Sequence, residues 1–386
     1  MGFIKGMDVS TLLEMEELGA GYYDNGIQGD MLEILKAYGM NSVRLRLWND
    51  PYSEDGHPYG AGTNDLPRTV RLIKRAHSIG VSVLLDFQYS DFWADPGKQT
   101  MPKAWRELDY GALKKEVYEY TRNTLSVMKD EDCLPELIQT GNELSNGLLW
   151  PFGKEGNRKE IAELVSAGIR GVKSIDPDIP VMIHLDNGGN NKLYRRWFDD
   201  YFEYNGEDFE YIGLSYYPFW HGTLEGLSAN MADISLRYKK DLIVAEVSMG
   251  FTMEDYRSYE RRGRDPGTEL IGMATRPELV EKIEYPMTKE GQAGFMKDIM
   301  TRISEVPGGR GKGFYYWEPG WLPIPGSGWA NEYALEYTKE KGPGGNEWAN
   351  QALFDYDGNA LPALETIRDF SGVQIKNNIK AKEGER

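Results

Sequence analysis

The feature that most constrains how this chain can fold is a series of eight short apolar runs, separated by longer amphipathic stretches. The runs cover residues 3–9, 42–48, 81–88, 137–140, 180–185, 211–217, 241–247 and 313–317. Near-continuous apolar runs that alternate with helices are typical of parallel strands buried on both faces. Helical patterns lie between them at 29–38, 66–79, 110–128, 159–175 and 289–306. Together they predict an α/β fold, a single (β/α)8 TIM barrel.

Other architectures find less support in the sequence. A doubly wound parallel sheet is the alternative, but no Gly-rich phosphate loop follows the first run. The chain has 386 residues, 40% of them hydrophobic, which is enough for one large core. No linker rich in Ser, Gly or Pro divides it. We therefore assign residues 1–372 to one catalytic barrel and expect the charged residues 373–386 to form a disordered tail.

The formal net charge of −17 is spread along the chain rather than gathered in a tail. Phosphate groups bind to basic faces, so we expect no nucleic acid partner and no anionic membrane partner. No run of about 20 apolar residues could span a bilayer. The N-terminus, MGFIKGMD, lacks the features of a signal peptide. The location stays open, cytoplasmic if the chain is complete and secreted if a leader was removed.

Polar residues stand at the end of nearly every predicted strand. In a (β/α)8 barrel these carboxyl ends form the active-site face. Buried polar groups need a compensating reason, so their repetition indicates a functional site. The residues are Asp8, Arg46, Asp86, Gln88, Asn142, Glu143, His184, Asp186, Tyr216, Glu246, Trp317 and Glu318.

Two of these residues are carboxylates that could act together. Glu143 ends the fourth run and Glu246 lies in the seventh, so in a barrel they face each other over the mouth. Glycoside cleavage needs one carboxyl to protonate the leaving oxygen and another to attack or to activate water. Either Glu could instead pair structurally with an Arg. A separation of about 5–5.5 Å would indicate retention of configuration, and 8 Å or more would indicate inversion.

Two arginines share one face of the second strand. Arg44 and Arg46 stand two residues apart, so both point into the barrel, where they need anionic partners. Asp8, Asp86 and the catalytic carboxylates are the candidates. In a functional interpretation an Arg keeps the nucleophile ionised by lowering its pKa. A purely structural ion network is the alternative.

Metal and cofactor sites are not indicated. The four histidines are scattered, without the i, i+4 spacing of a helical zinc site. Cys133 is the single cysteine, which excludes an intrachain disulfide and a Cys cluster. His184, within the fifth run, is open to either a structural or a site role. The long segment 250–288 shows no oxygen-ligand spacing, so we predict no metal and no cofactor.

Several motifs resemble a known family, the arabinogalactan endo-β-1,4-galactanases of glycoside hydrolase family 53 in clan A. The matching stretches run from about residue 6 to about 370. They are GMDVS, NSVRLRLWNDP, LLDFQYSDFWADPGKQ, IQTGNELSNGLLWP, IHLDNG, GLSYYPFW, VAEVS, GFYYWEPGW and NQALFDYDGNALPAL.

The resemblance implies an endo-acting, retaining hydrolase of β-1,4-galactan. Glu143 would be the acid/base, Glu246 the nucleophile, and Asn142 would bind the sugar 2-hydroxyl. Tyr216 would touch the nucleophile, and Trp317 would form the floor beside the scissile bond. The full set of expected substrate-binding residues is Arg44, Arg46, Asp86, Gln88, Trp93, Asn142, His184, Asp186, Tyr216, Trp317, Glu318 and Trp321.

The chain departs from the family pattern in two places. Gln88 stands where the family usually has His, so it can donate a hydrogen bond but cannot carry a proton. This difference is expected to affect the pH dependence of activity, and not the hydrolysis reaction itself. The loop after the seventh strand also differs from the calcium-binding version of some bacterial members, so calcium is not indicated.

Three other functions are weighed against this one. A clan relative could act on another β-glycan, such as mannan or xylan. A non-catalytic carbohydrate-binding barrel would need neither carboxylate of the pair. A phosphate-handling barrel is disfavoured by the acidic mouth and the missing anion loop. We expect a polysaccharide partner and a monomer, with 10 Trp and 24 Tyr available as platforms for sugar rings.

Overall fold

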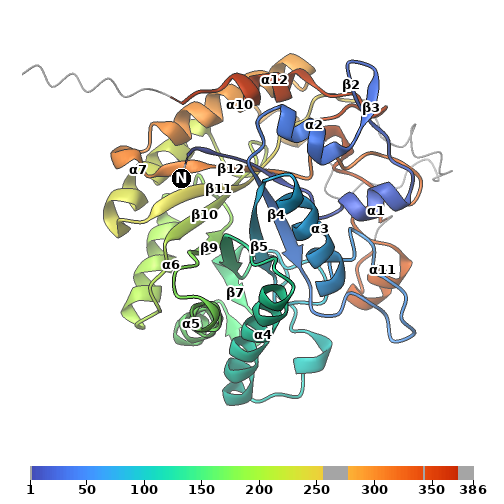
Figure 1. Ribbon diagram of the computed structural model, residues 1–386. Coiled ribbons are helices and arrows are strands. Elements are labelled where there is room, and N and C mark those ends of the chain that lie inside the picture. Colours follow the sequence, from blue (N-terminus) through green and yellow to red (C-terminus); the bar gives the residue numbers. More distant parts are fainter. Residues whose placement is uncertain (1, 255–276, 342–343, 373–386) are drawn as a thin grey trace, which may run out of the picture.

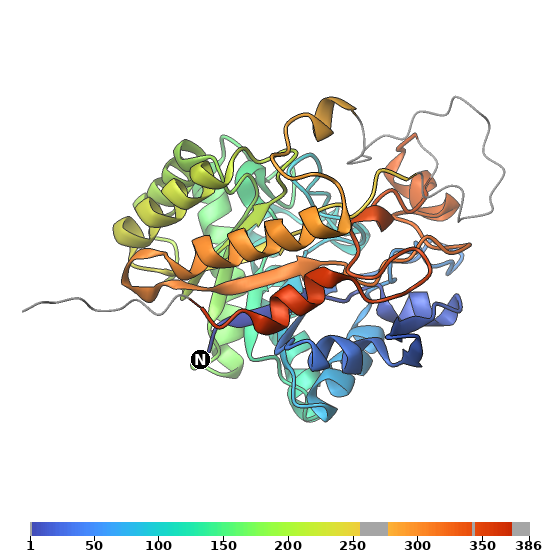
Figure 2. The same cartoon turned by 90° about the horizontal axis from the view of Figure 1, so that it is seen from above.

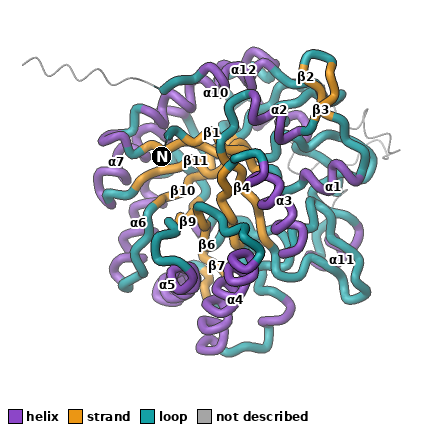
Figure 3. Tube along the Cα trace, in the orientation of Figure 1, coloured by secondary structure: helices purple, strands orange, loops and turns teal. Residues whose placement is uncertain are grey.

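The structure is a computed structural model that describes residues 2–254, 277–341 and 344–372. Eight parallel strands form a closed barrel in the order β1-β12-β11-β10-β9-β6-β5-β4, with helices around it (Figures 1 and 3). The strands are β1 (Ile4–Asp8), β4 (Ser42–Leu47), β5 (Ser82–Phe87), β6 (Leu137–Thr140), β9 (Val181–Leu185), β10 (Tyr211–Tyr216), β11 (Asp241–Val247) and β12 (Gly311–Trp317). All eight predicted strands are found, and the predicted barrel is confirmed.

The helices cover the outside of the barrel. They are α1 (Leu12–Glu17), α2 (Met31–Ala37), α3 (Leu66–Ser78), α4 (Tyr110–Asp130), α5 (Arg158–Ile175), α6 (Asn191–Glu203), α7 (Leu224–Tyr238), α9 (Pro277–Val280), α10 (Lys289–Ser304), α11 (Glu332–Thr338) and α12 (Pro362–Asp369). Short 3-10 turns are η1 (Lys103–Trp105), η2 (Leu144–Asn146), η3 (Pro307–Gly309) and η4 (Ala349–Gln351). The five predicted helices are present as α2, α3, α4, α5 and α10, and the other helices are additional to them.

Side-chain caps fix where many of these helices begin. The carboxylates of Asp30, Asp65 and Asp109 accept backbone N–H groups in the first turns of α2, α3 and α4. The prediction 29–38 therefore starts too early, because Gly29 ends the hairpin of β2 (Tyr22–Asp24) and β3 (Ile27–Gly29). A second hairpin joins β7 (Gly147–Leu148) to β8 (Gly153–Lys154) beside the barrel mouth.

The barrel interior changes from apolar to polar along the strands. Leu84 and Met182 belong to a small buried apolar cluster in the lower half of the barrel. Two residues further along the same faces stand Asp86 and His184, which are fully buried. The carboxyl ends of the strands therefore carry a layer of buried polar side chains, and apolar side chains fill the barrel interior below it.

The C-terminal part of the described chain closes the outer layer. Helix α12 packs beside α10 (Figure 2), and β1 pairs with β12 on one side and β4 on the other. No helix within the described ranges is both long and apolar enough to cross a membrane. The predicted tail 373–386 and residues 255–276 of the segment 250–288 lie outside the described residues.

Candidate active site

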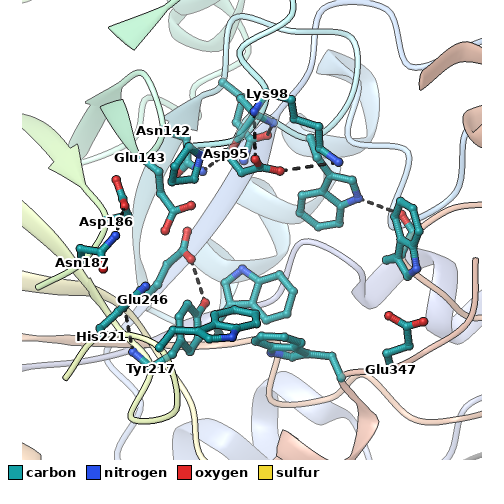
Figure 4. Close-up of a pocket in the computed structure, with 18 of the residues that line it drawn as sticks. Asp95, Lys98, Asn142, Glu143, Asp186, Asn187, Tyr217, His221, Glu246 and Glu347 are labelled. Carbon is teal, nitrogen blue, oxygen red and sulfur yellow. Dashed lines mark hydrogen bonds and ion pairs between the residues drawn. The ribbon is translucent and has the colours of Figure 1, made fainter. Parts of the chain in front are cut away.

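Glu143 and Glu246 meet at the carboxyl end of the barrel. Glu143 lies just after β6, between Gly141 and η2, in a left-handed backbone conformation with φ of 50°. Such strain in a residue with a side chain typically marks a functional site. Glu246 lies within β11, and Figure 4 shows the two carboxyl groups directed toward one another. One carboxyl oxygen of each lies within 4.8 Å of the other.

The two carboxyl groups open into a cavity of about 830 Å³. The predicted residues that line it are Glu143, Glu246, Gln88, Trp93, Asn142, Asp186, Trp317 and Trp321. Lining residues that the sequence analysis did not name are Ala94, Asp95, Pro96, Lys98, Asn187, Tyr217, Trp220, His221, Trp329, Glu340, Lys341, Glu347 and Trp348. Most of these additions come from loops that follow the strands.

Glu246 is held on both oxygens by groups that favour a negative charge. Arg44 Nη1 lies 2.9 Å from Glu246 Oε1, and the Tyr217 hydroxyl donates to Glu246 Oε2 at 2.8 Å. Burial raises the pKa of this carboxyl, while the Arg44 guanidinium and the Tyr217 hydroxyl act in the opposite direction. Glu246 is therefore the better stabilised anion of the pair.

The prediction that Tyr216 touches the nucleophile is wrong, because Tyr217 makes that contact. Tyr216 points outward, stacks on Phe295 of α10 and donates its hydroxyl to the Gly222 carbonyl. Successive side chains of a strand point to opposite faces, so Ser215 and Tyr217 share the inner face. Counting this alternation along GLSYY could have identified both residues.

Glu143 carries no salt bridge in the described structure, unlike Glu246. Its Oε1 lies 2.5 Å from the hydroxyl of Ser215. Burial and the nearby Glu246 carboxylate raise the pKa of Glu143 well above its usual range. Two carboxyls this close cannot both ionise easily, and Glu143 is the member of the pair whose surroundings favour the protonated form.

Arg44 is the centre of a buried charge network. Its Nη1 lies 2.8 Å from Asp8 Oδ2, and its Nη2 lies 2.9 Å from Asp86 Oδ2. Nη2 also donates to Asn142 Oδ1 at 2.8 Å. Burial raises the pKa of Asp86 to about 7, although the Arg44 charge opposes this shift. The prediction that the strand-two arginines find anionic partners inside the barrel is confirmed.

Arg46 completes the network on the other side of Asp8. Its Nη1 lies 2.6 Å from Glu318 Oε1 and 3.1 Å from Asp8 Oδ1. The guanidinium carbon lies 4.5 Å from the ring centroid of Trp93, a cation–π contact that fixes this cavity residue. Burial raises the pKa of Glu318 to about 7 against the Arg46 charge.

Five residues predicted to bind substrate lie behind the cavity instead. Their side chains are buried in the barrel and hold the lining residues in place. They are Arg44, Arg46, Asp86, His184 and Glu318. The strand ends carry two polar layers, and residue type alone does not tell the inner layer from the one that faces the cavity.

His184 belongs to the inner layer. Its Nδ1 lies 2.9 Å from Asn142 Oδ1, and its Nε2 lies 2.9 Å from Ser215 Oγ. Donor atoms of Glu143, His184 and Glu246 lie within 4.8 Å of one another, the one such group among the described residues. Because both His184 nitrogens are engaged in hydrogen bonds to protein groups, this trio is poorly suited to a metal ion. The absence of a metal remains a prediction.

Gln88 and Asn142 are anchored amides that line the cavity. Gln88 Oε1 accepts from Trp48 Nε1 at 2.8 Å and from the Ala94 backbone N–H at 3.1 Å. Asn142 Nδ2 donates to the Ala94 carbonyl at 2.8 Å, which leaves its second hydrogen for another acceptor. Both amides therefore fix the backbone of the loop that follows β5.

Tryptophan rings form a continuous strip along the cavity. Trp220 contacts Trp348 at 5.5 Å between centroids, and Trp348 contacts Trp317 at 5.1 Å. Trp317 contacts Trp321 at 5.4 Å and Trp93 at 6.0 Å. Neighbouring rings are tilted or edge-on to one another, so the strip presents both ring faces and ring edges, and such apolar surfaces are suited to contact with sugar rings.

A closely spaced carboxyl pair at the mouth of a (β/α)8 barrel, beside a tryptophan-lined groove, defines a glycoside hydrolase. The family model for glycosyl hydrolase family 53 matches residues 4–367, and the chain belongs to this family.

Relatives support the family assignment over nearly the whole chain. An endo-beta-1,4-galactanase of Bacillus subtilis (strain 168) is 37% identical over 385 residues, covering 95% of this chain and 85% of the relative. An arabinogalactan endo-beta-1,4-galactanase A of Aspergillus niger is 33% identical and covers 82% of this chain and 85% of its own length.

Solved structures agree with the fold. The GH53 catalytic domain of Ignisphaera aggregans is 40% identical, with a TM-score of 0.85 and 95% of both chains covered. A fungal beta-1,4-galactanase structure is 29% identical, with a TM-score of 0.75, covering 95% of this chain and 98% of that one. A xylanase from Caldicellulosiruptor owensensis, 13% identical with a TM-score of 0.57, covers 95% of this chain and 97% of its own and shares the fold alone.

Proposed function

We propose that the protein is an endo-acting, retaining hydrolase of β-1,4-galactan, with Glu246 as nucleophile and Glu143 as acid/base. The observation that carries this proposal is the unequal environment of two carboxyls within 4.8 Å of each other. Arg44 and Tyr217 support a negative charge on Glu246, whereas Glu143 has only neutral hydrogen-bond support. The short separation suits direct attack by a carboxylate and leaves too little room for a water between them.

In the first displacement, Glu246 attacks the anomeric carbon from the α face. Glu143 gives its proton to the glycosidic oxygen, so that bond breaks and a covalent ester to Glu246 forms. Asn142 lines the same cavity, and the second hydrogen of its Nδ2 is proposed to bind the sugar 2-hydroxyl, as the family resemblance implies. Contacts that strengthen as the sugar approaches the transition state lower the barrier.

In the second displacement, Glu143 acts as a base. It removes a proton from water, the water oxygen bonds to the anomeric carbon from the β face, and the ester to Glu246 breaks. The released sugar therefore keeps the β configuration. Arg44 and Tyr217 stabilise the carboxylate that leaves.

The choice of galactan rests on the names of the relatives and on the groove. The relatives at 33% and 37% identity are endo-1,4-galactanases by name. The tryptophan rings line the same cavity as the carboxyl pair, so sugar rings next to the cleaved bond can contact them. Such a groove fits attack within a polymer.

The test is a panel of polysaccharides with reducing ends as the readout. We expect reducing sugars from linear β-1,4-galactan, with a rapid fall in chain length at low conversion, and far smaller rates on β-mannan and xylan. Proton NMR of the first product should show the β anomer. Preferred release from mannan or xylan would favour the other clan-A substrates. No shortening of any of these polymers would favour a non-catalytic binding barrel.

Trp220→Ala should reduce kcat/KM on long galactan by about 10-fold, because stacking on one sugar ring contributes roughly 1.4 kcal/mol. Trp220 is 44% exposed and lies at one end of the tryptophan strip. The effect should shrink on galacto-oligosaccharides too short to reach it. Tyr204→Ala, an exposed aromatic next to α6 and outside the cavity, is the control. Equal losses on short and long substrates would contradict a binding role for Trp220.

A further inference from the structure

The peptide bond that precedes Glu143 is held by the loop after β5. Gln99 of this loop is 2% exposed. Its Nε2 donates to the Asn142 carbonyl at 2.8 Å and to the Asp95 carbonyl at 3.3 Å. Because both partners are carbonyl oxygens, which can only accept, the nitrogen end of the Gln99 amide must face them. The shorter bond therefore joins the peptide between Asn142 and Glu143 to the loop.

This peptide determines where the Glu143 carboxyl points. A peptide unit is planar, so the Asn142 carbonyl and the Glu143 N–H turn together. Rotation of that plane changes φ of Glu143, which is 50°, with a ψ of 56°. A residue with a side chain stays in this left-handed region only when its surroundings hold it there. A hydrogen bond to the Asn142 carbonyl acts directly on this conformation.

We propose that Gln99 is a positioning residue that fixes the Asn142–Glu143 peptide and thereby directs the Glu143 carboxyl at the glycosidic oxygen. This inference rests on the proposed role of Glu143 as acid/base. Gln99 does not line the cavity, so it acts through the peptide and not on the sugar. Without its N–H donors the peptide can rotate, and the carboxyl loses its alignment for proton transfer.

The loop that carries Gln99 has other attachments to the segment after β6. The Trp150 backbone N–H donates to the Gln99 carbonyl at 2.9 Å, and Asn146 Nδ2 donates to the Pro96 carbonyl at 2.8 Å. Neither bond uses the Gln99 side chain. The loop should therefore keep its place when only that side chain is changed, and the effect should be confined to the peptide before Glu143.

The experiment compares two substrates in Gln99→Met, which keeps the length of the side chain and removes both N–H donors. Cleavage of galactan needs Glu143 to protonate the leaving oxygen, whereas the leaving group of a dinitrophenyl β-galactobioside needs no proton. We expect kcat/KM to fall about 100-fold on galactan and to stay within about 2-fold of wild type on the dinitrophenyl substrate. Equal losses on both substrates, or no loss on either, would overturn the proposal.

The second displacement gives a separate readout, because Glu143 must then act as a base on water. On the dinitrophenyl substrate, kcat and KM should fall together in Gln99→Met, since the covalent intermediate accumulates. Azide should restore kcat, because this nucleophile needs no base. A general loosening of the structure would not be rescued in this way, so a kcat that azide leaves unchanged would contradict a positioning role.

Gln292→Met is the matched control. Gln292 of α10 is also fully buried, and its Nε2 donates to two backbone carbonyls, those of Met249 at 2.8 Å and Ala352 at 2.9 Å. Its loss should change kcat/KM on the two substrates by the same factor. Circular dichroism checks that both variants fold. A galactan-selective loss as large as that of Gln99→Met would overturn the proposal.

Gln99→Glu tests the donor itself. A protonated carboxyl can donate one hydrogen bond to the Asn142 carbonyl, whereas a carboxylate can donate none. This variant should keep more activity on galactan than Gln99→Met at acidic pH and should lose that advantage as the pH rises. Equal activity of the two variants over the whole pH range would contradict a donor role for Gln99.

A crystal structure of Gln99→Met separates this inference from the proposed function. If the wild-type protein does not cleave galactan, the proposed function fails, but φ of Glu143 can still be measured. A Glu143 φ outside the left-handed region would support the positioning role of Gln99. A φ that stays near 50° would overturn it.

Discussion

Glu246→Ala is expected to lower kcat on galactan by about 10⁵-fold while leaving galactan binding measurable. The covalent intermediate cannot form without this carboxylate. The rest of the site stays in place, because Glu246 is a partner in the Arg44 network rather than its centre. Asp8 and Asp86 continue to hold Arg44, so loss of folding should not account for the lost rate.

Azide identifies the missing group. In Glu246→Ala, azide can occupy the space of the lost carboxylate and attack an aryl β-galacto-oligosaccharide from the α face. The product should be the α-galactosyl azide, detected by NMR. In Glu143→Ala the covalent intermediate still forms with an activated leaving group, so azide attacks it from the opposite face and gives the β-azide. Near-wild-type turnover in Glu246→Ala, or the reverse pairing of azide products, would contradict the assignment.

The fold was predictable because its signal is repeated. Each strand is buried on both faces, so each is an apolar run, and each run ends in polar residues at the same end of the barrel. The pair Glu143 and Glu246 follows from this repetition. The exact helix starts were harder, because Asp30 can be read as a helix start only once Gly29 is known to belong to a hairpin.

The presence of polar residues inside the barrel was predictable, but the prediction that they face the cavity was wrong. Arg44 and His184 are correctly inside the barrel, but they hold cavity residues and do not face the cavity. The depth of a side chain depends on strand tilt and on neighbours from other strands. The single step from Tyr216 to Tyr217 shows how a prediction by residue type fails where strict alternation would have succeeded.

The loop-borne part of the groove could not be predicted from the sequence. Trp93 Nε1 donates to the Trp329 carbonyl, a contact between residues 236 positions apart. Trp220 and Trp348 likewise meet from loops after different strands. No local pattern specifies such contacts, because loop conformation is set by the tertiary structure around it.

The second large effect is expected on stability. Arg44→Leu should lower the free energy of unfolding by about 3–5 kcal/mol, because it leaves several buried carboxylates without their cation. Asp8, Asp86 and Glu246 all lie within 2.9 Å of the guanidinium nitrogens. Activity should fall as well, since Glu246 loses a main support for its negative charge. Arg237→Leu, which breaks an exposed two-point pair with Asp199, is the control and should cost at most about 1 kcal/mol.

The loss of unfolding free energy in Arg44→Leu should depend on pH, and the pKa values of the buried carboxyls determine the direction of this dependence. Asp86 has a folded-state pKa of about 7, above its unfolded value, so the native state binds more protons and stability falls as pH rises through this window. Removing Arg44 raises that pKa further and strengthens the trend. Urea unfolding should therefore show a larger deficit at pH 8 than at pH 5, where the carboxyls can take up protons. A deficit equal at both pH values, or no larger than that of Arg237→Leu, would mean that Arg44 does not compensate these charges.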